Sequence, residues 1–248
     1  ELIRASGDRV IAGEEAATAN AFGDGGAAVW AHQRVLDRLI DETAAGGANA
    51  PRKEQWPSDV TDQPVYGMYF NDEAVQLHHA RNATTDGQVM VLFRQSDVIA
   101  AGDILNLTSY PVIDVARGGT IDGELVALNK LIEMIVPDDQ AANGTIVIPG
   151  HGRVADLGDV ARYTVMVTSI RNRVQFYKNQ GKSLEQVLAL KPSAEYDERW
   201  SARSGLGTTR EFITAVYNTL PRRGPVFFSM ETVTTVPATG PESGKRRF

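Results

Sequence analysis

Two residues with reactive side chains stand where short apolar runs end. Asp103 follows the run Val98–Ala101 and Gly102, whose backbone freedom permits a turn. His151 follows another apolar run and lies between two glycines, which allow a ligand to approach closely. Loops at the ends of strands often build functional sites. Structural roles stay open for both: a turn or helix N-cap for Asp103, and an ordinary structural histidine for His151.

The absence of cysteine limits the chemistry that this chain can perform. Disulfides, thiolate zinc sites and a cysteine nucleophile are excluded. A soft-metal site would need carboxylates together with the four histidines, His32, His78, His79 and His151. No serine lies in a G-x-S-x-G elbow, and no glycine cluster has the spacing of a phosphate-binding loop.

The composition is that of an acidic globular protein. The 248 residues carry 25 Lys and Arg against 31 Asp and Glu, a formal net charge of −6. Nucleic-acid binders usually show a basic face, so we expect no nucleic-acid partner. The length predicts one large domain or two small ones. No membrane span is expected, because no run of about 18 apolar residues occurs.

Apolar periodicity predicts a β-meander followed by helices. The predicted strands are Val65–Phe70, Glu73–His78, Gln88–Phe93, Asp97–Ala101 and Gly144–Pro149, with further strand-like runs at Asp8–Ala12 and Val226–Met230. The predicted helices are Gln33–Thr43, Glu124–Val136, Val160–Gln180, a short helix capped by Ser183 that ends near Leu190, and Phe212–Leu220. The segment Ala44–Gln63 is interpreted as a long loop, either a lid or a surface excursion.

The order and spacing of several segments resemble the metallo-β-lactamase-fold hydrolases. The segments that carry the resemblance are Trp30–Val35, Thr85–Gln88, Asp97–Ile104, Gly118–Thr120 and Ile148–Gly152, with a similar helical end at Lys182–Leu220. The resemblance implies an α/β (α+β) domain of the αββα sandwich type over residues 1–220. Residues 221–248 are expected to form a partly disordered C-terminal extension.

The resemblance also implies a zinc site, with one or two ions as the cofactor. By position, Asp103 resembles the aspartate that bridges the metals, and His151 resembles the last histidine ligand. Thr84 stands where another histidine is expected, and a neutral hydroxyl is a poor zinc ligand. His79 and Asp86 resemble residues that lie behind the ligands. The implied site is therefore degenerate at Thr84.

The H-x-H-x-D-H motif of that family does not occur in the sequence. We therefore expect the chain to begin just after it, leaving the N-terminal part of the sandwich incomplete. A second chain, another segment or a second copy of this chain is expected to complete the fold, because exposed sheet faces and edges invite association.

Two functional hypotheses follow from the resemblance. The first is a metal-dependent hydrolase that attacks an ester- or amide-type bond of a small-molecule substrate. The second is an inactive pseudoenzyme that serves as a structural or binding subunit. Members of this branch often carry export signals, which suggests a periplasmic or exported location.

Overall fold

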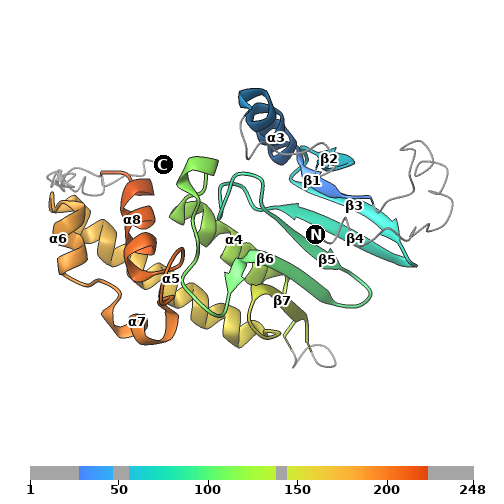
Figure 1. Ribbon diagram of the computed structural model, residues 1–248. Helices are drawn as coiled ribbons and strands as arrows, with labels where there is room; N and C mark the ends of the chain where they lie inside the picture. Colours follow the sequence, from blue (N-terminus) through green and yellow to red (C-terminus); the bar gives the residue numbers. More distant parts are fainter. Residues whose placement is uncertain (1–27, 47–55, 138–143, 223–248) are drawn as a thin grey trace, which may run out of the picture.

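The computed structural model describes residues 28–46, 56–137 and 144–222 (Figure 1). The strand-like runs predicted at Asp8–Ala12 and Val226–Met230 lie outside these ranges, as does almost all of the predicted C-terminal extension. In chain order the elements are β1 (Trp30–His32), α3 (Gln33–Ala45), β2 (Asp59–Thr61), β3 (Val65–Phe70), β4 (Glu73–His79), β5 (Val89–Phe93), β6 (Val98–Asn106), the 3₁₀ turn η4 (Val115–Arg117), α4 (Ile121–Met134), β7 (Ile146–His151), α5 (Leu157–Asn179), α6 (Leu184–Ala189), α7 (Ala194–Trp200) and α8 (Thr209–Thr219).

The predicted meander forms a mixed sheet of five strands. Its order is β3-β4-β5-β6-β7, with β3 to β6 antiparallel and β7 parallel to β6. Tight turns at Asn71 and Asp72, both with positive φ, join β3 to β4. A helical connection is needed between β6 and β7, since parallel neighbours cannot be joined by a hairpin. Helix α4 lies in that connection.

Two sequence predictions need correction, and one helix was missed. β6 continues to Asn106, so Asp103 lies within the strand rather than after it, and it caps no helix. The predicted loop Ala44–Gln63 contains β2, which pairs in parallel with β1. Helix α7 was not predicted, because it is short, its large apolar residues at helical spacing are limited to Tyr196 and Trp200, and it has no side-chain N-cap bond. In each case tertiary contacts, rather than local pattern, set the structure.

One face of the sheet packs against helices α4 and α5, and this contact forms the core. Ile99 of β6 and Val147 of β7, which are paired in register, are both fully buried there. The helical side of the core includes Leu128, Leu131, Val160, Val167, Ile170 and Val174. Figure 1 shows α4 to α8 gathered on one side of the sheet, whereas α3 lies with β1 and β2 near its other end. None of the helices described is both long and apolar enough to span a bilayer.

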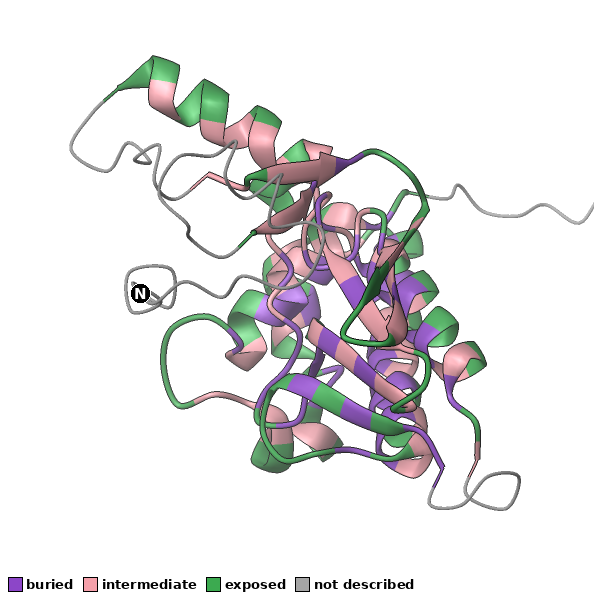
Figure 2. Ribbon diagram, turned by 90° about the vertical axis from the view of Figure 1, so that its right-hand side faces the viewer, coloured by how far each residue is buried: buried purple, intermediate pink, exposed green. Residues whose placement is uncertain are grey.

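The opposite face of the sheet is also apolar but lies open at its β7 edge. Ile146 and Ile148 alternate with buried residues along β7 and are 42% and 45% exposed. Their registered neighbours on β6 are Val98 and Ala100, which are half-buried. Figure 2 shows this alternation of buried and exposed residues along the strands. The sheet therefore presents apolar side chains on both faces, as the central sheet of a sandwich does.

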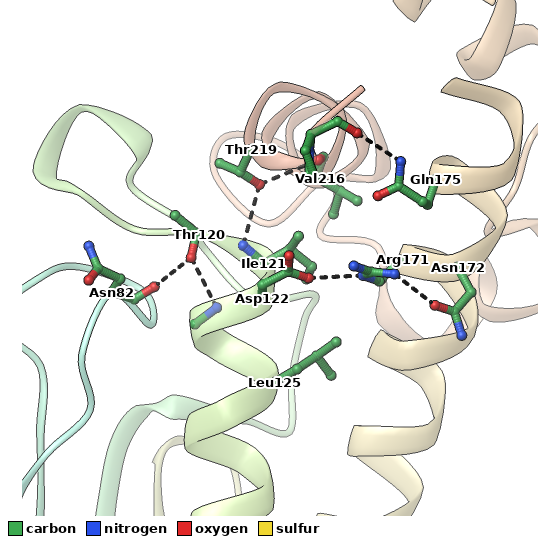
Figure 3. Close-up of polar contacts among 12 residues, drawn as sticks. Asn82, Thr120, Ile121, Asp122, Leu125, Arg171, Asn172, Gln175, Val216 and Thr219 are labelled. Atoms are coloured by element: carbon green, nitrogen blue, oxygen red, sulfur yellow. Dashed lines mark hydrogen bonds and ion pairs between the residues drawn. The ribbon is translucent and has the colours of Figure 1, made fainter. Parts of the chain in front are cut away.

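A polar network at the start of α4 fixes the loop that follows β4. The hydroxyl of Thr120 caps the helix by accepting from Gly123 N, and it donates to the carbonyl oxygen of Asn82 at 3.0 Å (Figure 3). On the other side of α4, Arg171 of α5 pairs with Asp122 at 2.9 Å. The loop that carries Thr84 and the helices of the core are therefore held as one unit.

Candidate metal centre

The structure brings Asp103, which lies within β6, close to His151, the last residue of β7. His151 Nε2 lies 3.7 Å from Asp103 Oδ1. The side chain of Asp103 is 63% exposed and that of His151 is 62% exposed, so both polar groups face solvent. The pairing of Gly102 on β6 with Pro149 on β7 places Asp103 beside the end of β7 that carries His151.

The glycines around this pair are required by close packing rather than by flexibility alone. A Cβ atom at Gly150 would lie 2.6 Å from Asp103 Oδ1 and 2.8 Å from the backbone of Gly102. Gly102 has a φ of +56° and would place a Cβ 2.9 Å from Gln88 Nε2. The two strands can approach closely only because these positions lack side chains.

Thr84 is buried in the loop between β4 and β5. Its side chain is 3% exposed, and its hydroxyl oxygen has no hydrogen-bond partner among the described residues. Its carbonyl oxygen accepts from Asp114 N at 2.9 Å, and a Cβ at Gly119 would lie 2.2 Å from that oxygen. The backbone of Thr84 is thus clamped by the segment before α4, while its hydroxyl is left buried.

His79 and Asp86 belong to a packed cluster with His32 and Arg38. The rings of His32 and His79 are stacked with centroids 3.6 Å apart. His79 Nε2 donates to the carbonyl oxygen of Asp86 at 2.8 Å, and the Asp86 carboxylate forms an ion pair with Arg38. His32 begins α3 as predicted, with Nδ1 accepting from Arg34 N. Burial is the main cause that lowers the pKa of both His32 and His79.

Sequence reasoning missed a buried carboxyl group close to Asp103. Glu124 on α4 is fully buried, and neither of its carboxylate oxygens has a partner among the described residues. Burial, followed by the negative charge of Asp103, raises the pKa of Glu124 well above its ordinary value and so favours the neutral acid. Its position, four residues before the buried Leu128, was the available signal, because it falls on the apolar face of the helix.

The residues described supply only part of a zinc site. A carboxylate oxygen and an imidazole nitrogen are suitable zinc donors, but a catalytic site uses three protein ligands. Within the three ranges that the structure describes, no group of three or more His, Asp or Glu side chains is placed to hold a metal ion. These residues alone therefore do not fit zinc, and additional ligands would be required.

No protein-family model matches the sequence, and no curated protein sequence matches it. Solved structures do match. The stereoselective inverting sec-alkylsulfatase from Pseudomonas sp. is 14% identical with a TM-score of 0.55, over 86% of this chain and 38% of that enzyme. A double mutant of that alkylsulfatase is 16% identical with a TM-score of 0.51, over 87% of this chain and 37% of the other. A metallo-β-lactamase from Pontibacter korlensis is 10% identical with a TM-score of 0.42, over 61% of each chain.

The two alkylsulfatase likenesses show the fold of the chain. It has the metallo-β-lactamase-type mixed α/β fold, as the order of the sequence segments predicted. The chain spans well under half the length of the alkylsulfatase. Because the sequence identity is low, the likeness is limited to the fold.

Proposed function

We propose that this chain is part of a metal-dependent hydrolase in which Asp103 and His151 bind zinc. The observation that carries the proposal is the 3.7 Å approach of His151 Nε2 to Asp103 Oδ1 on the paired strands β6 and β7. Both groups are exposed, so an ion and a substrate can reach them. Bound zinc supplies an acidified water and polarises a scissile bond. This chemistry suits an ester- or amide-type bond of a small-molecule substrate.

The remaining ligands would come from residues outside the described ranges or from another chain. The open sheet face at Ile146 and Ile148 supports this part of the proposal, because it offers apolar surface against which a further segment can pack. A second copy of this chain would serve equally well as the covering element. The proposed hydrolase therefore depends on ligands that lie outside the described residues or on another chain.

An inactive pseudoenzyme is the second candidate, and Thr84 is the observation that favours it. Its hydroxyl is buried without a partner among the described residues at the position where the family resemblance expects a histidine. A site that lacks this ligand binds metal less tightly. Such a chain would act as a structural or binding subunit.

Zinc content separates these two functions. The purified protein is equilibrated with zinc, dialysed and analysed for metal per chain. We expect at least one bound zinc ion, lost in His151→Gln and retained in the control His78→Gln, whose ring contacts Gln76. Hydrolysis of p-nitrophenyl esters should follow the metal content. A wild-type protein that retains no zinc would overturn the metal site and favour the pseudoenzyme.

A further inference from the structure

A large cavity borders the candidate metal centre. It has a volume of about 1010 Å³ and lies between helices α5 and α7 and the segment that follows β6. Gly152, the residue after His151, forms part of its wall. Small-molecule sites in proteins occupy about 300–1,000 Å³, so this cavity is large enough for a ligand of moderate size. We call it the arginine cavity, after the three arginines at its edge, Arg153, Arg162 and Arg199.

One wall of the arginine cavity is apolar. Leu107, Val165, Met166 and Trp200 contribute to it. Val165 is 61% exposed, although it is a large aliphatic residue on a core helix. Trp200 is held in place by an edge contact with Tyr163 at 5.2 Å. Apolar surface of this kind is stabilised when a ligand removes it from water.

Two arginines at the edge are oriented by one buried carboxylate. Asp159 is 6% exposed, and it accepts from Arg153 at 2.7 Å through both oxygens and from Arg162 at 2.6 Å. Burial opposes ionisation of Asp159, but the hydrogen bonds from both arginines lower its pKa, so it stays charged. The single carboxylate of Asp159 thus binds two guanidinium groups. The side chains of Arg153 and Arg162 nevertheless remain 68% and 70% exposed.

The third arginine has no carboxylate partner among the described residues. Arg199 donates to the carbonyl oxygen of Leu107 at 3.0 Å, and its guanidinium lies 4.6 Å from the centre of the Trp200 ring. A guanidinium fixed by a backbone oxygen and an aromatic face keeps further N–H donors for a ligand. The charged residues that line the cavity are therefore three arginines and one aspartate, an excess of positive charge beside an apolar wall.

We propose that the arginine cavity binds a small organic anion in which a carboxylate or sulfonate group is attached to an apolar body. The anionic group would contact Arg162 and Arg199, since guanidinium groups match the geometry of planar or tetrahedral oxyanions. The apolar body would lie against Val165 and Trp200. This binding requires neither zinc nor hydrolysis, so it stands or falls separately from the proposed enzyme activity.

Isothermal titration calorimetry with four probes that have apolar chains of similar length tests the chemistry of the ligand. Octanoate and octane-1-sulfonate carry the proposed groups, octan-1-ol carries no charge, and octyltrimethylammonium carries the opposite charge. We expect at least one anion to bind about tenfold more tightly than the alcohol, and the cation to show no binding. The stronger anion identifies the preferred headgroup. Equal binding of the alcohol and both anions would overturn the proposal.

Two pairs of matched variants locate the binding. Val165→Glu places a negative charge in the cavity, whereas Val126→Glu changes a valine of α4 that is 68% exposed and does not line the cavity. Arg162→Gln removes one edge charge, and Arg210→Gln removes an arginine of similar exposure that also pairs with one carboxylate. We expect Val165→Glu to abolish binding and Arg162→Gln to weaken it roughly fivefold, the upper range for an exposed ion pair. Binding unchanged in Val165→Glu and Arg162→Gln would contradict this location.

Tryptophan fluorescence gives an independent readout of the same site. The sequence has three tryptophans, and Trp200 is the one that lines the cavity. The stronger anion should change the emission of the wild-type protein. Trp200→Phe should remove that change while retaining an aromatic contact with Tyr163. A response that persists in Trp200→Phe would place the ligand elsewhere.

Discussion

The packed cluster of His32, His79 and Asp86 and the exposed pair of Asp103 and His151 use the same side-chain types in opposite ways. In the packed cluster the two histidine rings stack. The carboxylate of Asp86 pairs with Arg38, and its carbonyl oxygen accepts a hydrogen bond from His79. In the exposed pair each polar group has only the other as an ion-pair partner among the described residues. The packed cluster makes its contacts inside the fold, although His32 Nε2 is buried without a hydrogen-bond partner among the described residues. The exposed groups of Asp103 and His151 remain available to a ligand.

The largest expected difference between these two regions is in zinc affinity. Asp103→Asn removes a charged donor from the exposed pair and should weaken zinc binding roughly 100-fold, the upper end of the range for residues that support metal sites. Asp86→Asn removes a charge of the packed cluster and should leave zinc affinity within about threefold of wild type. Competition with a chromophoric chelator measures both. Equal losses would show that the packed cluster also contributes to the metal site.

Stability should change in the opposite order. His79→Ala removes a stacked ring and leaves the Asp86 carbonyl oxygen without its donor, so it should lower the free energy of unfolding by about 2 kcal/mol. His151→Ala removes a side chain that is 62% exposed, so it should change the free energy of unfolding by less than about 0.5 kcal/mol. Urea denaturation followed by circular dichroism measures both values. A larger loss for His151→Ala would reverse the assignment of structural and ligand-binding roles.

The smallest expected effect is on the pH dependence of stability. Burial lowers the pKa of His32 and His79 from the ordinary value of 6.5, so below that pH the unfolded chain binds more protons than the folded chain. The free energy of unfolding should therefore begin to decrease as the pH falls below about 6.5, because the unfolded histidines take up protons first. Unfolding measured at pH 7.5 and pH 5.5 should show a smaller difference in His79→Gln than in wild type.

Much of the fold could be predicted from local sequence pattern. The strand Val65–Phe70 has the predicted bounds, and Ser183 with Gln186 forms the predicted capping box of α6. The approach of Asp103 to His151 was expected only through the family resemblance. The polar helix α7 and the extension of β6 were not predictable, because neighbouring elements rather than local periodicity stabilise them.

Residue types and order by themselves determined the alternating strands, the apolar stripe of α4 and the absence of thiolate chemistry in this protein. The tertiary structure decided which reactive side chains meet. It paired β6 with β7 so that Asp103 lies near His151, and it buried Glu124 in the core. It also placed two arginines on Asp159 and a third over the ring of Trp200. Local periodicity records which face of an element is apolar. It does not record which distant element that face will meet, because that depends on packing across the whole chain.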